Sequence, residues 1–122
     1  MAVVINPDGT ATQIIPRDRS RGFTMEEIKK AIGGGWIELV RLAPLAAMMQ
    51  ITPDADKIIK QHPHAWIYLI IDEEGKLKNL PRNRVATMLY QQTHITTDTI
   101  VGPALMCVVT DKMNDDDMEV IL

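Results

Sequence analysis

Two groups of arginine and amide side chains have the composition and spacing that best fit a chemical task. The groups are Arg17, Arg19 and Arg21, and then Arg82, Asn83 and Arg84. The first group alternates along the chain, and alternate residues of an extended segment share one side. The second group lies where a helix is predicted to begin, and a helix N-terminus favours negative charge. A guanidinium matches phosphate or carboxylate with two hydrogen bonds. Both groups are therefore predicted to bind an anionic ligand, such as a nucleotide, a nucleotide-derived signal or an acidic protein surface. A solvated basic loop is the simpler alternative.

Two other clusters contain groups that bind metals. Asp72, Glu73 and Glu74 offer carboxylates of the kind that Mg²⁺ or Ca²⁺ prefers, but Gly75 and Lys76 follow at once, as in an ordinary turn. His62 and His64 could point to one side of an extended segment and bind zinc with a third ligand such as Asp72 or His94. A small metal-dependent hydrolase is thus the rival hypothesis, while a solvated turn and a polar loop are the simpler interpretations.

Neither a nucleophile motif nor a phosphate loop is found in the chain. The hydroxyl side chains considered, none in a Gly-x-Ser-x-Gly elbow, are Ser20, Thr87, Thr93, Thr96 and Thr97. The run Gly33-Gly34-Gly35 lacks the Lys-Ser/Thr pair of a phosphate loop and follows a predicted helix instead of a strand. The sequence therefore favours a protein that is not an enzyme and uses no cofactor.

Sulfur-containing residues suggest packing first and an interface second. Cys107 is the single cysteine and lies in an apolar run, which predicts a buried, inert thiol. Eight methionines in 122 residues is a high number, and the thioether adapts to varied partners. Core packing is the simpler interpretation, and an oligomer or partner interface at residues 43–51 or 113–122, with Met48, Met49, Met113 and Met118, is the alternative.

Length and charge narrow the class of protein. A chain of 122 residues with 46 % hydrophobic residues suits one domain spanning residues 1–122. A formal net charge of −3 argues mildly against non-specific nucleic-acid binding. The sequence has neither a signal-peptide pattern at its start nor an apolar run long enough to span a bilayer. We therefore expect a cytoplasmic protein without membrane contact.

Turn and cap residues indicate the helices and strands that carry these side chains. Asn6-Pro7-Asp8-Gly9 predicts a hairpin turn, and Thr24 with Glu27 forms a capping-box pattern at the start of a helix over 24–32. The predicted strands are 3–5, 12–15, 36–42, 66–71, 77–80 and 99–109, with a further edge strand or interaction tail within 112–122. The other predicted helices are a short one over 54–61 and a second main helix over 82–91, with Pro81 in its first turn and Val85, Met88 and Leu89 on one face. Residues 46–51 fit either a strand or a helical turn.

This order of elements predicts the fold class. Strands outnumber helices and come in neighbouring pairs, which favours a mostly antiparallel sheet. We expect a single-domain α+β protein with two main helices packed on one face of that sheet.

The chain resembles a family of short phage and mobile-element proteins known as domain of unknown function 3846. The resemblance covers about residues 1–43 and 66–110, with a longer insert over 43–65 and with Pro103 where a polar residue is more usual. It rests on these segments in order: Asn6-Pro7-Asp8-Gly9, Phe23-Thr24-Met25-Glu26-Glu27, Gly33-Gly34, the strand from Trp36 to Leu42, Asp72-Glu73-Glu74-Gly75-Lys76, Leu80-Pro81, Asn83, Ala86-Thr87 and Ile100-Val101-Gly102. The resemblance implies a phage or mobile-element origin and an intracellular setting, and it supplies neither an activity nor catalytic residues.

These observations lead to one functional hypothesis and one alternative. The sequence predicts a non-enzymatic phage or mobile-element protein in the host cytoplasm that sequesters an anionic, nucleotide-like ligand or blocks a host factor, with counter-defence as one reading. The alternative is a protein-interaction or homo-oligomerisation module that works through its Met-rich and acidic C-terminal surfaces.

Overall fold

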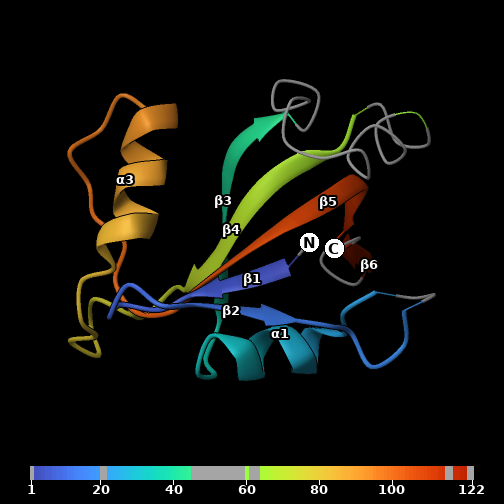
Figure 1. Ribbon diagram of the computed structural model, residues 1–122, viewed down its shortest axis with the longest axis horizontal. Coiled ribbons are helices and arrows are strands. Elements are labelled where there is room, and N and C mark those ends of the chain that lie inside the picture. The colour runs from blue at the N-terminus through green and yellow to red at the C-terminus, as the bar shows by residue number, and fades with distance from the viewer. Residues whose placement is uncertain (1, 20–21, 45–59, 61–63, 115–116, 121–122) are drawn as a thin grey trace.

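An antiparallel sheet forms the centre of the protein (Figure 1). The computed structural model describes residues 2–19, 22–44, 60, 64–114 and 117–120. Along the chain the elements are β1 (Ala2–Ile5), β2 (Ala11–Ile14), α1 (Met25–Ala31), β3 (Ile37–Pro44), β4 (Trp66–Asp72), α3 (Arg84–Thr93), β5 (Ala104–Asn114) and β6 (Asp117–Val120). The expected α+β class with an antiparallel sheet and two main helices is confirmed.

The strands are ordered β2-β1-β5-β4-β3, and β6 also pairs with β5. The length of β5 makes this arrangement possible. β1 pairs with its first residues, at 104–106, and β6 pairs with its later residues, from Val109 onward. Since β4 occupies the other edge of β5, strands β1 and β6 follow one another along the same edge. The expected edge strand within 112–122 is therefore present at 117–120.

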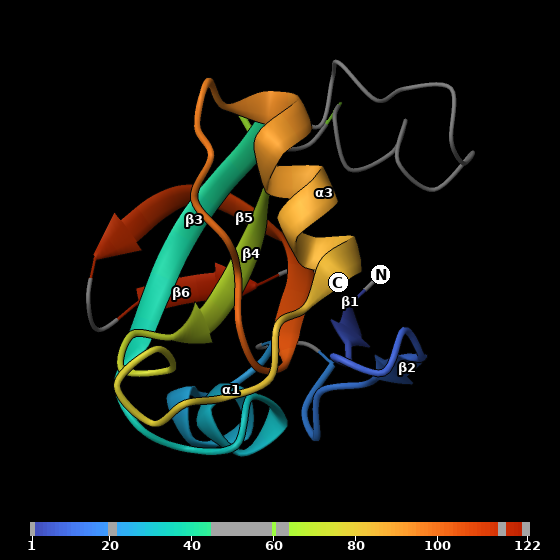
Figure 2. The ribbon, with the colours of Figure 1, turned by 90° about the vertical axis from the view of Figure 1, so that its left-hand side faces the viewer.

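The two helices lie on opposite faces of the sheet, so the expectation that both pack on one face is wrong. Ile67, Leu69 and Ile71 of β4 belong to the hydrophobic cluster that includes Ala86 of α3. The alternate residues Tyr68 and Ile70 belong to a second cluster, which includes Ile28 of α1 and its C-cap residue Ile32. Successive side chains of a strand point to opposite faces, so β4 is covered from both sides. Two views show the helices apart, with strands of the sheet between them (Figures 1 and 2).

Local predictions in the first third of the chain are confirmed. β1 and β2 form the predicted hairpin, with Ala2 opposite Ile14 and Ile5 opposite Ala11. The capping box of α1 is complete, because the Thr24 hydroxyl accepts from the Glu27 amide while the Glu27 carboxylate accepts from the Thr24 amide. Two hydrogen bonds that would otherwise be missing at the helix start are thereby made.

Three predictions between β4 and β5 need correction. Residues 77–80 do not form a return strand, because 73–79 fold into consecutive turns closed by hydrogen bonds such as that from the Leu80 amide to the Gly75 carbonyl. The second main helix begins at Arg84, after the cap residue Asn83, so Pro81 lies before its first turn. β5 begins only at Ala104, after Pro103, and the segment before it contributes a single bridge between Arg82 and Val101.

Several predicted features fall outside the described residues. These are Arg21, Ser20, His62, Met48, Met49, the segment 46–51 and, except for Lys60, the short helix over 54–61. Among the described residues, no helix has the length and apolar character that crossing a bilayer requires.

Candidate functional site

The two arginine groups lie at opposite ends of β1. Arg17 and Arg19 follow β2, whose last residue Ile14 pairs with Ala2 at the start of β1. Asn83 donates instead to the carbonyl of Ile5, at the end of β1. Figure 1, drawn with the longest axis horizontal, shows the segment after β2 on the right and the start of α3 on the left. The described arginines of the two groups therefore do not converge on one ligand.

The first group is tied to the start of α1. The amide of Arg17 donates to the Glu27 carboxylate at 2.9 Å, and this bond and the bond from the Thr24 amide lower the pKa of Glu27. The side chains of Arg17 and Arg19 are exposed. A depression lies instead beside Arg82 and Arg84, so the α3 end is the better candidate.

Asn83 holds the fold together and is not part of the surface. Its side chain is fully buried. The side-chain amide donates to the carbonyls of Ile5 at 2.8 Å and Gly102 at 2.9 Å, and the side-chain oxygen accepts from the Ala86 amide at 3.1 Å. Because these bonds use both amide hydrogens and cap α3, this residue positions its two neighbours, Arg82 and Arg84, instead of presenting a group to a ligand.

A depression of about 520 Å³ lies along the first two turns of α3. We call it the α3 site; it is lined by Arg82, Arg84, Thr87, Met88, Gln91 and Gln92. Met88 was expected on the buried face with Val85 and Leu89, but its side chain is 51 % exposed, while those two pack against the core. Residues three, four, seven and eight positions apart share one helix face. On this face the side chains of Met88, Gln91 and Gln92 are exposed, and Thr87 is buried.

The charges at the start of α3 are unusual for a helix. The first turn of α1 contains Glu26 and Glu27, as the helix dipole favours. The first turn of α3 contains no acidic residue and begins instead with Arg84. Among the described residues neither Arg82 nor Arg84 has an acidic partner in an ion pair. Arg82 and Arg84 therefore both border the α3 site near the positive end of the α3 dipole.

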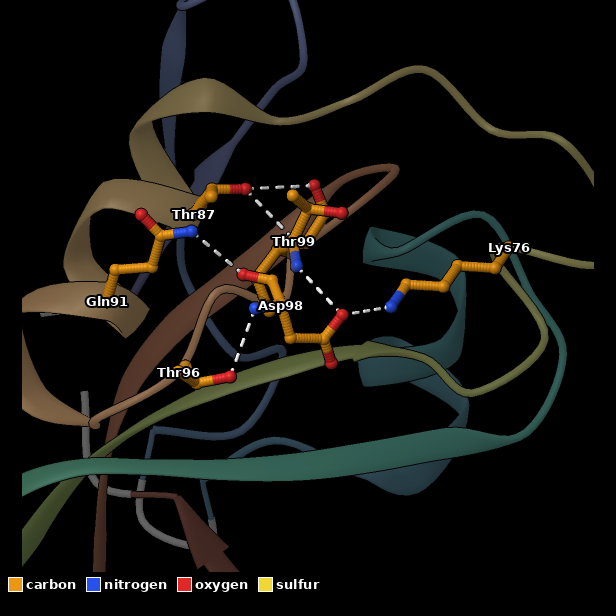
Figure 3. A network of polar contacts seen from close by, with 7 residues as sticks. Lys76, Thr87, Gln91, Thr96, Asp98 and Thr99 are labelled. Atoms are coloured by element: carbon orange, nitrogen blue, oxygen red, sulfur yellow. Dashed lines mark hydrogen bonds and ion pairs between the residues drawn. The ribbon is translucent and has the colours of Figure 1, made fainter.

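Thr87 connects α3 to the segment that leads into β5. Its hydroxyl accepts from the Ile100 amide at 2.9 Å and lies 3.2 Å from the Ile100 carbonyl. The residue is 2 % exposed. Figure 3 shows this hydroxyl directed at the 96–100 segment. Because it is buried and engaged on both sides, the hydroxyl is not available as a nucleophile.

The acidic residues after β4 organise a turn. The buried Asp72 carboxylate accepts from Lys78 at 2.7 Å and from the Glu74 amide at 2.9 Å. Burial raises the pKa of Asp72, but these hydrogen bonds outweigh that effect, so its pKa lies below the ordinary value. The side chains of Glu73 and Glu74 are exposed. The turn interpretation of this acidic segment therefore fits the geometry.

The proposed metal ligands His64 and Asp72 are far apart. His64 lies before β4 and Asp72 ends it, so a strand of six residue steps, or about 20 Å, separates them. Within the described ranges, no group of three or more His, Cys, Asp or Glu side chains could hold a metal ion. Asp72 therefore does not lie beside His64, and His62 is outside the described residues.

Three of the sulfur-containing residues considered above lie in β5 and β6. Cys107 is 1 % exposed on the α1 side of the sheet, and burial raises the pKa of its thiol to about 12. The predicted burial of this thiol is confirmed, and its raised pKa agrees with the expected low reactivity. Met113 and Met118 lie opposite one another in β5 and β6. The C-terminal segment at 117–120 is therefore built into the sheet, and the interaction role of this region stays a prediction.

Sequence reasoning found the arginines of the α3 site but missed the side chains that complete it. Helical spacing from Arg84 would have indicated Met88, Gln91 and Gln92 on its face. Gln91 also donates a hydrogen bond to the backbone carbonyl of Asp98 at 3.0 Å. This contact depends on the path of the segment after α3, which no local sequence pattern predicts. No protein-family model matches the chain, and searches of curated proteins and of solved structures likewise returned no match.

Proposed function

We propose that the protein is a non-enzymatic binding protein that holds an anionic, nucleotide-like ligand at the α3 site. The observation that carries the proposal is the pair of exposed guanidinium groups, Arg82 and Arg84, beside a depression at the start of a helix. Guanidinium groups and unpaired helix amides both bind phosphate oxygens. A basic first turn weakens α3 by itself, and a bound anion offsets that cost.

Binding without turnover agrees with the side chains that line the site. The lining consists of Arg, Thr, Met and Gln side chains, and the hydroxyl of Thr87 is engaged. General acid–base catalysis needs a group that exchanges a proton near neutral pH, and these side chains supply none. Sequestration of the ligand is the role that fits such a lining.

The biological setting belongs to the proposal as well. A phage or mobile-element origin, a site of action in the host cytoplasm and a counter-defence role follow from the family resemblance alone. A protein that sequesters a nucleotide-derived signal of the host would combine that setting with the α3 site. Blocking of a host protein through the same two arginines is the other form of the proposal.

The α3 site can be tested by measuring thermal stability with added polyphosphates. Pyrophosphate or ATP is expected to raise the Tm of the protein, because a ligand that binds only the folded state stabilises it by mass action. Arg82→Gln combined with Arg84→Gln is expected to abolish that rise. The matched control is Arg17→Gln with Arg19→Gln, which removes the same charge at the other end of β1 and is expected to retain most of it.

Two outcomes would contradict the proposal. If neither pyrophosphate nor any nucleotide of a broad panel changes the Tm, the α3 site does not bind anions of this class. If both double variants reduce the Tm shift equally, binding depends on overall charge and not on the α3 site.

A further inference from the structure

Gln91 is held in one orientation by the segment that follows α3. Its side-chain nitrogen Nε2 donates to the backbone carbonyl of Asp98 at 3.0 Å. A carbonyl oxygen only accepts, so the Nε2 group of the carboxamide must face Asp98. The carboxamide oxygen Oε1 is consequently on the side away from Asp98, as Figure 3 shows, and Gln91 lines the α3 site.

The carbonyl that orients Gln91 is itself fixed by several contacts. The Asp98 carboxylate pairs with Lys76 and accepts from the Thr99 amide at 2.8 Å, and the Asp98 amide donates to the Thr96 hydroxyl at 3.0 Å. Figure 3 shows these contacts gathered around Asp98. The residue connects the turn after β4, the segment before β5 and the outer face of α3, so the acceptor Oε1 is preorganised.

The α3 site has different chemistry at its two ends. Arg84, Met88 and Gln91 are spaced by four and three residues, which places them in a row along one helix face. Seven residue steps from Arg84 to Gln91 span about 10 Å along the helix axis. Cationic donors therefore stand at one end, a half-exposed thioether in the middle and a fixed hydrogen-bond acceptor at the other end.

We infer that Gln91 is a specificity-determining residue, which accepts a hydrogen bond from an N–H donor at the end of the ligand opposite its anionic group, and that Asp98 positions it. This inference rests on the proposed function and narrows its ligand class. The matching ligand is elongated, with phosphate groups at Arg82 and Arg84, a planar ring over Met88 and an amino group at Gln91. A nucleotide whose base has an exocyclic amino group meets all three conditions, and sulfur contacts with ring systems are favourable.

The test compares two nucleotides that differ only in that donor. ATP and purine riboside 5′-triphosphate share the phosphates, the sugar and the ring system, but the second lacks the amino group. ATP is expected to bind about fivefold more tightly, the effect of one net hydrogen bond. Gln91→Leu is expected to bring the two affinities together and to leave the affinity for tripolyphosphate unchanged. Gln13→Leu, an exposed position on β2, is the control and is expected to retain the difference.

The positioning role of Asp98 has its own readout. Asp98→Ala keeps the backbone carbonyl but removes the carboxylate contacts with Lys76 and Thr99. It is expected to reduce the preference for ATP while the affinity for tripolyphosphate stays the same. A purely structural role would lower both affinities together.

The possible results separate this inference from the proposed function. If tripolyphosphate and both nucleotides bind with equal affinity, the inference is wrong and the anion-binding proposal stands. If Gln91→Leu retains the preference for ATP, another residue recognises the amino group and the inference is again wrong. If none of the three compounds binds, both the inference and the proposed function are overturned.

Discussion

Asp72 shows how a residue that resembles a metal ligand can serve the fold. Its carboxylate is 5 % exposed and contacts the Lys78 ammonium and the Glu74 amide. Gly35 packs directly against this pair, since a Cβ at that position would come within 2.8 Å of Lys78 Nζ and 2.9 Å of Asp72 Oδ1. The carboxylate is therefore enclosed by the turns that precede β3 and follow β4, and metal coordination would require that enclosure to open.

The pH dependence of stability should report this carboxylate. The pKa of Asp72 in the folded protein lies below its ordinary value of 3.8. The associated stabilisation is thus fully present above that value and is lost as the pH falls through the folded pKa. In Asp72→Asn, urea denaturation is expected to give a lower free energy of unfolding at pH 7 and a smaller decline between pH 5 and pH 2 than in the unaltered protein.

The comparison between the two proteins isolates Asp72, because the pKa values of Asp8, Glu27 and Asp98 are also lowered and those residues are present in both. Parallel stability curves below pH 5 would show that the pKa of Asp72 does not change on folding, which would contradict this prediction.

At the scale of elements, Asn83 is the residue that joins α3 to the sheet. One side chain caps the helix and binds carbonyls at the end of β1 and before β5. The anionic-site prediction included Asn83 because of its place between two arginines. The structure instead requires two hydrogen-bond donors and one acceptor from the side chain at this buried helix start. Asparagine supplies all three, whereas aspartate lacks the donors.

Asn83→Ala is expected to destabilise the protein by about 3 kcal/mol, since it removes the cap and leaves two buried carbonyls without donors. The midpoint of urea denaturation measures this effect. Asn83→Asp is the informative comparison, because it retains the capping oxygen and loses the donors. Full stability in the aspartate variant would mean that capping alone is what matters at this position.

The α3 site also shows the limit of prediction at this scale. Arg82 and Arg84 could be placed near a helix start because Pro81 and the residues after it have clear local preferences. Gln91 and Asp98 are seven residues apart, and their contact depends on how the segment after α3 returns along the helix. The path of this segment depends on the burial of Ile100 and Thr87 and on the hydrogen bond between them. These contacts form only when the whole protein is packed.

At the scale of the whole molecule, the sheet separates two hydrophobic clusters. β4 is buried over Ile67–Asp72 without alternation, which is the pattern of a strand covered on both faces. Its uninterrupted apolar sequence could have predicted a helix on each side. The prediction of both helices on one face was based on the pairing of neighbouring strands. Strand order, however, does not determine how many faces of a sheet are covered.

Double-mutant cycles can test this two-sided arrangement. Ile28→Ala and Ile70→Val alter one cluster and are expected to show a coupling energy of about 0.5 kcal/mol or more, because the two side chains belong to the same packed group. Ile28→Ala and Ile71→Val alter different clusters and are expected to be additive within about 0.3–0.5 kcal/mol. The free energies come from urea denaturation. Equal coupling in both cycles would contradict the separation of the clusters by the sheet.

Features that depend only on neighbouring residues could be predicted from the amino-acid sequence. The Asn6–Gly9 turn, the Thr24–Glu27 capping box, the apolar strand β4 and the buried thiol of Cys107 all follow from local conformational preference or local hydrophobicity. Three other features became visible only in the folded protein. They are the face that each helix covers, the separation of the described arginines, and the orientation of Gln91 by Asp98 in the α3 site. These features depend on contacts between residues distant along the chain, and such contacts are fixed by the packing of the whole sheet and its two cores.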